Sequence, residues 1–155
     1  MFQQIFVRAM AFLALVASLT ACAGPSIGPM PRSIAPGYVY ALTGRYGDDN
    51  FYRPLLYRIP ARCAGRTIEL QAWYRTEGIT AGVRTYHGIH FDYEVFATGG
   101  APVYPPDWRA EPSYEWQPIN RTWNIPADMR SGHVRIGLQG VSGVLYVRDI
   151  QVTGC

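Results

Sequence analysis

Polar and apolar residues alternate through residues 86–96, which read YHGIHFDYEVF. From residue 87 to residue 95 the odd positions are largely apolar, whereas the even positions are polar or glycine. Successive side chains of a β-strand point to opposite faces of the sheet. The pattern therefore predicts a half-buried strand with His90, Asp92 and Glu94 together on its solvated face. Three such side chains on one face also suit a metal ion or the hydroxyl groups of a sugar, so both functional interpretations stand beside simple solvation.

The same two-residue period recurs along the rest of the chain, between turns rich in glycine, asparagine and aspartate. It predicts seven strands, at residues 38–43, 51–59, 66–75, 82–96, 114–125, 132–139 and 144–152. No amphipathic helix of useful length follows the N-terminal region. Seven or eight short strands separated by turns predict an all-β fold, an antiparallel β-sandwich.

The last predicted strand contains a change of register. Leu145 and Val147 are apolar residues at odd positions, whereas Ile150 and Val152 are apolar residues at even positions. Both pairs belong in the core, so the chain must shift by one residue near position 148. A β-bulge at Arg148–Asp149 produces this shift.

The N-terminus contains an apolar run at residues 9–19, which is too short to span a bilayer and has the length of a signal-peptide core. Residues 19–22, Leu-Thr-Ala-Cys, resemble the lipobox of bacterial lipoproteins. The resemblance implies that residues 1–21 are a signal peptide and that Cys22 carries the lipid. Because Ala23 rather than an aspartate follows the cysteine, it also implies the outer membrane of the cell envelope.

Residues 22–37 are rich in proline and glycine and show no apolar period, so they predict a flexible tether. One β-sandwich domain is then expected at residues 38–155. Cys63 and Cys155 remain outside the lipobox, and export to an oxidising compartment favours a disulfide between them. The formal net charge is +3, and no basic run is present. This balance does not favour a nucleic-acid partner.

Four segments are similar to a known family, and two of them are residues 53–78 and 132–143. Residues 143–152, GVLYVRDIQV, resemble the closing strand of galactose-binding-like jelly rolls, the fold of many carbohydrate-binding modules. Residues 114–126, YEWQPINRTWNIP, resemble the Trp-led strand that ends in proline, with Trp116 and Pro126 in those places. The resemblance covers about residues 50–153. It implies a jelly-roll sandwich and a non-catalytic, glycan-binding function.

The chain departs from the family at the acidic pair of the closing strand. Arg148 stands where the family has the first aspartate, and Asp149 alone matches. In several of these modules the pair helps to hold a structural calcium ion, so the resemblance gives weak support for calcium here. Asp48 and Asp49 are the other candidate oxygen ligands. No other cofactor is expected.

Aromatic residues supply the best candidates for glycan contacts, because sugars stack their C–H faces on aromatic rings. The loop at residues 99–116 combines several rings with charged side chains, and Trp108 is the ring hardest to bury there. Trp116 and Trp123 are assigned to the core. The candidate ligand-binding residues are Trp108, Tyr104, Tyr114, Trp73, Arg109 and Asp107.

Two alternatives to glycan binding remain open. An exposed aromatic can contact another envelope protein instead, as in a structural or assembly lipoprotein. His90, Asp92 and His133 also resemble the two-histidine, one-carboxylate iron triad of 2-oxoglutarate oxygenases, although those enzymes need a larger domain. Glu111 and Glu115 show no pairing of the kind that glycoside hydrolysis requires. A non-catalytic, lipid-anchored module that binds a polysaccharide or envelope glycan is therefore the favoured interpretation.

Overall fold

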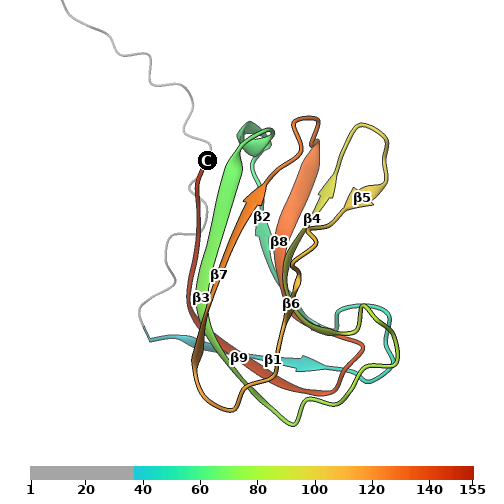
Figure 1. The fold of residues 1–155 in the computed structure, drawn as a ribbon, viewed down its shortest axis with the longest axis vertical. Helices are drawn as coiled ribbons and strands as arrows, with labels where there is room; N and C mark the ends of the chain where they lie inside the picture. Colours follow the sequence, from blue (N-terminus) through green and yellow to red (C-terminus); the bar gives the residue numbers. More distant parts are fainter. Residues whose placement is uncertain (1–36) are drawn as a thin grey trace, which may run out of the picture.

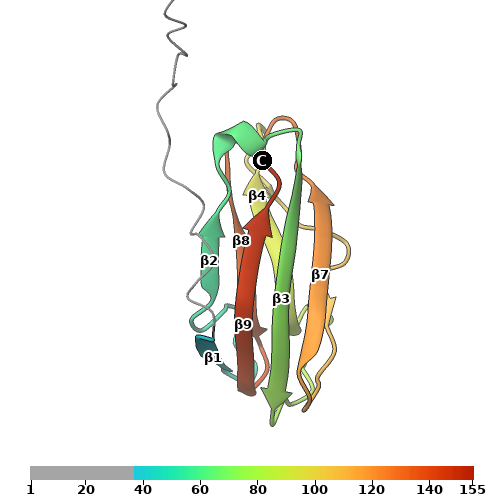
Figure 2. The ribbon, with the colours of Figure 1, turned by 90° about the vertical axis from the view of Figure 1, so that its left-hand side faces the viewer.

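The computed structural model describes residues 37–155. The predicted signal peptide, the predicted lipidation site at Cys22 and most of the predicted tether lie outside the described residues. Two antiparallel sheets pack face to face (Figures 1 and 2). The four-stranded sheet has the order β1 (Val39–Gly44), β9 (Gly143–Thr153), β3 (Thr67–Glu77) and β7 (Gln117–Asn124). The five-stranded sheet has the order β2 (Leu55–Arg58), β8 (Ser131–Gln139), β4 (Gly88–Phe96) and β5 (Pro102–Val103), with β6 (Arg109–Ala110) also paired to β4.

The core lies between the two sheets and is built by alternate residues of each strand. In β3, the even positions from Ile68 to Thr76 are buried, whereas most odd positions are exposed. In β4 and β8 the fully buried Phe91 and Ile136 face this layer from the other sheet. The two-residue period of the sequence thus becomes two inner apolar faces. This arrangement confirms the predicted antiparallel β-sandwich.

The predicted β-bulge in the closing strand is confirmed. Arg148 pairs with Trp73, and Gln151 pairs with Gln71, so two residues of β9 lie opposite the single residue Ala72. Asp149 within the bulge has a φ of 52°, in the left-handed region that non-glycine residues rarely adopt. The shift keeps the core residues of β9 inward on both sides of the bulge.

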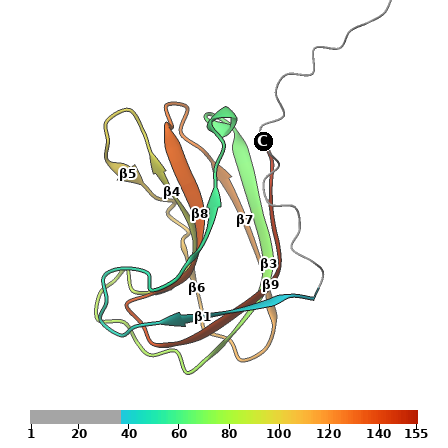
Figure 3. The same cartoon turned by 180° about the vertical axis from the view of Figure 1, so that it is seen from behind.

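The predicted disulfide between Cys63 and Cys155 is also confirmed, with 5.3 Å between the two Cα atoms. Cys63 ends a short 3-10 helix, η1 (Ala61–Cys63), in the connection from β2 to β3. Arg62 Nε donates a hydrogen bond of 2.9 Å to the carbonyl oxygen of Cys155. The chain end after β9 is therefore fastened to the crossover between the sheets. Figure 3 shows the C-terminus near this crossover.

Three of the predicted strands are shorter than the sequence pattern suggested, and one of them is the segment predicted at 114–125, which is a strand at 117–124. The segment predicted at 51–59 is a strand at 55–58, although Phe51 forms an isolated bridge with Gln139. The segment predicted at 82–96 begins at Gly88, because the chain before it folds back on itself. A Cβ atom added to Gly82 would lie 2.3 Å from the Cβ atom of His87. Between residues 37 and 155 no helix is long and apolar enough to cross a membrane.

Candidate functional site

The polar face of β4 is buried, and the expectation that it is solvated was wrong. His90 is 3% exposed and Asp92 is 1% exposed, while Glu94 is half-buried. The reason is the segment after β4, which carries β5 and β6 and folds back over this face. The indole ring of Trp108 stacks on the His90 imidazole, with 4.3 Å between ring centroids and 22° between ring planes.

Beneath this cover, charged groups of β4 and β8 form a closed network. Asp92 lies opposite Arg135 in the strand ladder, and its two carboxylate oxygens accept hydrogen bonds of 2.9 Å from Nε and Nη2 of Arg135. Arg135 Nη1 donates to Glu94 Oε1 at 3.2 Å, and the hydroxyl of Tyr104 donates to the same oxygen at 2.7 Å. Burial by itself lowers the pKa of Arg135, but the hydrogen bond to Asp92 and the charges of both carboxylates outweigh burial and raise the pKa above its usual value.

His90 is a member of this network and has no free ring nitrogen. Its Nδ1 lies 2.9 Å from Asp92 Oδ2, and its Nε2 lies 2.9 Å from the carbonyl oxygen of Tyr86. Both nitrogens therefore face oxygen acceptors, and neither is directed at a metal ion. In the strand ladder His133 lies opposite Glu94, four positions along β8 from the partner of His90. The hypothetical iron triad is thus not assembled.

The candidate calcium ligands also lie apart in the fold. Asp48 and Asp49 are in the β1–β2 loop, and Asp48 Oδ1 accepts a hydrogen bond from the backbone N–H of Asn50. Asp149 lies in the bulge of β9, beside the guanidinium of Arg148 at 3.7 Å. Within residues 37–155, no group of three or more His, Cys, Asp or Glu side chains is arranged to hold a metal ion.

A cavity of about 430 Å³ opens above the buried network, on the side of the five-stranded sheet that faces away from the core. Its wall combines aromatic rings with groups that can form hydrogen bonds. The lining residues are Asp49, Tyr86, His90, Asp92, Tyr104, Trp108, Arg135 and Gln139. A concave site with several rings and a few convergent polar groups is the usual form of a small-ligand site in proteins.

Asp49 and Gln139 leave acceptor atoms unused at the edge of this cavity. Asp49 Oδ1 accepts from the Tyr86 hydroxyl at 2.8 Å and from Arg84 Nε at 3.0 Å, and it lies 3.1 Å from His87 Nε2. The hydrogen bonds from Tyr86 and His87 lower the pKa of the Asp49 carboxyl. All three contacts use Oδ1, so Oδ2 keeps its lone pairs for a ligand. Gln139 similarly donates through Nε2 to the Asp49 carbonyl, which leaves its own amide oxygen available.

Asp107 and Arg109 hold the loop that positions Trp108. Asp107 Oδ1 accepts a hydrogen bond of 3.0 Å from the indole Nε1 of Trp123, which is a core residue. Arg121 Nη2 donates to the carbonyl oxygen of Arg109 at 2.9 Å. The backbone N–H of Phe91 donates to the carbonyl oxygen of Trp108 at 3.0 Å. These contacts come from β7 and β4, so the ring of Trp108 is supported from both sheets.

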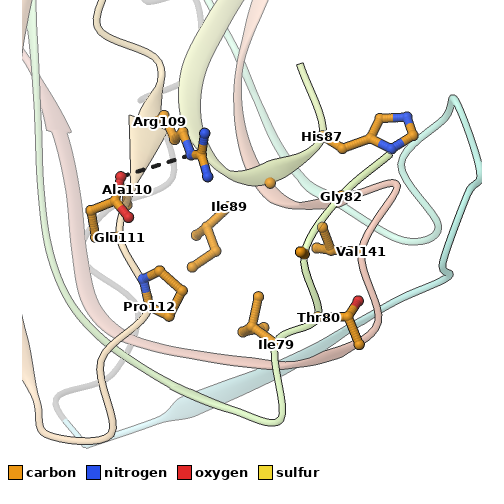
Figure 4. Close-up of a pocket in the computed structure, with 12 residues that line it drawn as sticks. Ile79, Thr80, Gly82, His87, Ile89, Arg109, Ala110, Glu111, Pro112 and Val141 are labelled. Atoms are coloured by element: carbon orange, nitrogen blue, oxygen red, sulfur yellow. Dashed lines mark ion pairs between the residues drawn. The ribbon is translucent and has the colours of Figure 1, made fainter. Parts of the chain in front are cut away.

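A second, smaller cavity of about 200 Å³ lies beside the first (Figure 4). It is lined by the 79–82 segment, by Val141 and by β6, and Arg109 and Glu111 form an ion pair of 3.8 Å at its edge. His87 also lines it, with its ring packed so closely on Gly140 that an added Cβ would lie 2.1 Å from the ring. Its lining residues include no tyrosine or tryptophan, unlike those of the larger cavity.

The structure brings some predicted site residues together and separates others. Trp108 and Tyr104 line the larger cavity, whereas Tyr114 is 79% exposed and is not among its lining residues. Trp73 lies on the outward face of the four-stranded sheet. Trp116 was assigned to the core, but its half-buried ring lies under the guanidinium of Arg148 instead, 4.4 Å from the ring centroid.

Sequence reasoning missed several residues that line the larger cavity, namely Tyr86, Arg135 and Gln139. Opposite charge on Asp92 and Arg135 was a signal that could have paired β4 with β8, because charged residues directly opposite each other stabilise a strand pair. The register that sets Asp92 opposite Arg135 is known only from the folded sheet, so the charges alone could not identify this pair. Asp49 was recognised, but as a candidate calcium ligand.

No family model matches the sequence, and no curated protein matches it. The fold is similar to a solved structure of CBM4, a carbohydrate-binding module, with a TM-score of 0.56 and 11% identity over 82% of this chain and 77% of that one. It also matches Family 16 Carbohydrate Binding Module-2, with a TM-score of 0.44 and 16% identity over 80% and 82% of the two chains. A third match is the CBM22-1 xylan-binding domain of Paenibacillus barcinonensis Xyn10C, with a TM-score of 0.46 and 10% identity over 78% and 84%.

The likeness to CBM4 confirms the fold that the sequence resemblance implied. The chain is an antiparallel β-sandwich of the kind found in carbohydrate-binding modules. At 11% identity the likeness concerns the fold alone. Function must therefore be argued from the residues of the larger cavity.

Proposed function

We propose that this protein is a non-catalytic glycan-binding module and that the cavity of about 430 Å³ is its binding site. The observation that carries the proposal is the combination of ring faces with unused acceptor atoms. Trp108 and Tyr104 offer surfaces on which a sugar ring stacks, while Asp49 Oδ2 and the Gln139 amide oxygen accept hydrogen bonds from sugar hydroxyls. Because Asp92 and Arg135 are paired with each other, the part of the cavity wall that they form keeps its shape without a ligand.

The same closed network argues against catalysis. An acid–base catalyst needs a titratable group that reaches the substrate with a proton to give or a lone pair to receive one. Asp92 and His90 are hydrogen-bonded to each other and to neighbouring groups. Asp49 is therefore the single lining carboxylate with an unused oxygen, and one carboxylate does not make the pair that glycoside hydrolysis requires. The similarity in fold to a carbohydrate-binding module fits a binding role.

We also propose that the module is anchored to the bacterial cell envelope by a lipid on Cys22, in the outer membrane. The support is the sequence alone, namely an apolar run that ends in Leu-Thr-Ala-Cys. The proline-rich tether that follows would let the domain reach a glycan away from the bilayer surface. A Cys22→Ser chain should leave the detergent phase in a two-phase extraction, and retention in that phase would contradict the anchor.

Affinity electrophoresis tests the glycan site. The full chain carrying Cys22→Ser is run in gels that contain xylan, mixed-linkage β-glucan, glucomannan or solubilised peptidoglycan strands. At least one of these glycans should retard it. Trp108→Ala should weaken the retardation at least tenfold, because aromatic anchors at the centre of a site commonly contribute more than about 1.4 kcal/mol.

Tyr114→Ala is the matched control, since Tyr114 lies in the same chain segment and is exposed but does not line the cavity. Trp108→Phe should restore part of the affinity, because phenylalanine keeps a ring face over His90. Equal retardation of the parent and Trp108→Ala proteins would refute the site. If no glycan retards the parent and a crosslinked envelope protein is recovered instead, the protein is an assembly lipoprotein.

A further inference from the structure

The outward face of the four-stranded sheet carries an ordered set of side chains that the cavity does not use. This face is turned toward the viewer in Figure 2, with β9, β3 and β7 side by side. Gln71 of β3 lies between Gln151 of β9 and Asn120 of β7 in the strand ladders. Two residues further along β3, Trp73 lies between Arg148 and Pro118. The face therefore has a row of three amides next to a row with an exposed indole ring.

The three amides of the first row are exposed and have unused hydrogen-bonding capacity. The side-chain hydrogen bonds on this face of residues 37–155 involve Thr67 with Asn124 and Glu77 with its neighbours Arg75 and Tyr146. None of them involves the amide groups of Gln71, Asn120 or Gln151. Each amide offers a donor and an acceptor side by side, which is the arrangement that vicinal sugar hydroxyls can match. Adjacent strands lie about 4.8 Å apart, so the row spans about 10 Å.

Trp73 is 40% exposed, whereas a tryptophan ring is highly buried on average. The Arg148 guanidinium lies 4.4 Å from the centroid of the Trp116 ring, and the Arg75 guanidinium lies 4.1 Å from the centroid of the Tyr146 ring. The residues around Trp73 are therefore engaged with one another, and the Trp73 ring remains exposed beside them. Alternate residues of a strand are about 7 Å apart, which places the amide row next to the ring.

The β-bulge of β9 is what completes the amide row. Without the extra residue, Gln151 would point into the core and Ile150 would point outward. With it, Ile150 is buried and Gln151 faces outward beside Gln71. The same local distortion therefore protects the core and places the third amide on the outer face.

We infer that this outer face is a second glycan-binding site, on the opposite side of the sandwich from the cavity. One sugar residue stacks on Trp73, and the next residue of the same polysaccharide contacts the row formed by Gln71, Asn120 and Gln151. A protein partner fits less well, because a protein interface centres on a cluster of apolar anchors, whereas on this face Trp73 is exposed among polar groups and the rings of Trp116 and Tyr146 lie under arginine guanidinium groups. The inference extends the proposed function, since two sites on opposite faces let one module join two glycan chains.

Isothermal titration with hexasaccharides of xylose, glucose, mannose and N-acetylglucosamine tests the second site. The full chain carrying Cys22→Ser should bind two molecules of one hexasaccharide. Trp73→Ala and Trp108→Ala should each bind one, and the double variant should bind none. Tyr46→Ala is the control, because Tyr46 is an exposed ring in the β1–β2 loop, away from the row. A Gln71→Ala, Gln151→Ala double variant should weaken the Trp73 site at least fivefold without changing the cavity.

The results separate the two sites. A stoichiometry of one that is lost in Trp108→Ala and unchanged in Trp73→Ala would overturn the second site and leave the cavity standing. A stoichiometry of one that is lost in Trp73→Ala alone would support the outer face and refute the cavity. If no hexasaccharide binds, or if Trp73→Ala instead abolishes capture of another envelope protein, the outer face is not a glycan site.

Discussion

The two outward faces of this sandwich handle polar groups in opposite ways. On the five-stranded sheet, Asp92 and His90 are buried, Arg135 is half-buried, and Asp92 forms hydrogen bonds with both His90 and Arg135. The ring of Trp108 covers His90. On the four-stranded sheet, Gln71 and its neighbouring amides stay exposed, and their hydrogen-bonding groups are free. The first face therefore has paired charges beneath a cavity, and the second has exposed amides on an open sheet, beside charged residues such as Arg75, Glu77 and Arg148.

This difference shows how one fold can build two kinds of binding surface. Burying an ion pair costs desolvation free energy. Removing one partner leaves the other charge buried and unpaired, so the pair holds the two strands in one arrangement. Exposed amide side chains cost little free energy of folding, because they remain hydrated, and they can form hydrogen bonds directly with a ligand. The cavity should consequently be sensitive to mutations beneath it, whereas the open face should be sensitive only to mutations on it.

The largest effect is expected from the disulfide, which fastens the end of the four-stranded sheet. Cys63 and Cys155 are 92 residues apart, and closing a loop of this length stabilises a protein by about 4–5 kcal/mol in the chain-entropy model. Cys155→Ser should lower the free energy of unfolding by about that amount in urea titrations. Because β9 ends beside Cys155, the open face should lose protection from hydrogen exchange before the cavity does. Equal loss on both faces would contradict this order.

Asp92→Ala should destabilise the cavity face by about 3–5 kcal/mol, since it leaves the Arg135 charge buried without its main partner. The free energy of unfolding, measured by chemical denaturation, checks this value. A change below about 1 kcal/mol would mean that the buried network is not formed in solution. Replacing Arg135 and Asp92 together with methionine and leucine should recover much of the loss.

Gln71→Ala on the open face should change the free energy of unfolding by less than about 0.5 kcal/mol, because the amide contacts solvent. The same denaturation experiment serves, with Asp92→Ala as the reference on the other face. A loss comparable to that of Asp92→Ala would show that the amide row is part of the packing rather than a free surface.

The sequence pattern predicted the sandwich because the two-residue period specifies which side chains share a face. It also predicted the bulge, since the apolar residues change parity between Val147 and Ile150. It failed on the polar face of β4, because periodicity cannot show that a later segment of the chain will cover a face. Trp108 lies 18 residues after His90, and its stacking on that ring follows from the tertiary fold.

The site was predicted in part for the same reason. Trp108 and Tyr104 could be chosen by composition, since rings in a proline-rich loop are hard to bury. Arg135 and Gln139 could not, because their places depend on the register between β8 and β4. The core assignment of Trp116 failed likewise, because its contacts with Arg75 and Arg148 join strands whose pairing the sequence leaves open.

The most direct test of the central claim is a titration followed through the indole N–H resonances of the four tryptophans by NMR. The full chain carrying Cys22→Ser is labelled with nitrogen-15 and titrated with the hexasaccharide that binds best. The account predicts a saturable shift of the Trp108 resonance, a separate shift of the Trp73 resonance, and little change at the core residue Trp123. A Trp108 resonance that stays in place with every hexasaccharide would contradict the claim that the cavity binds a glycan.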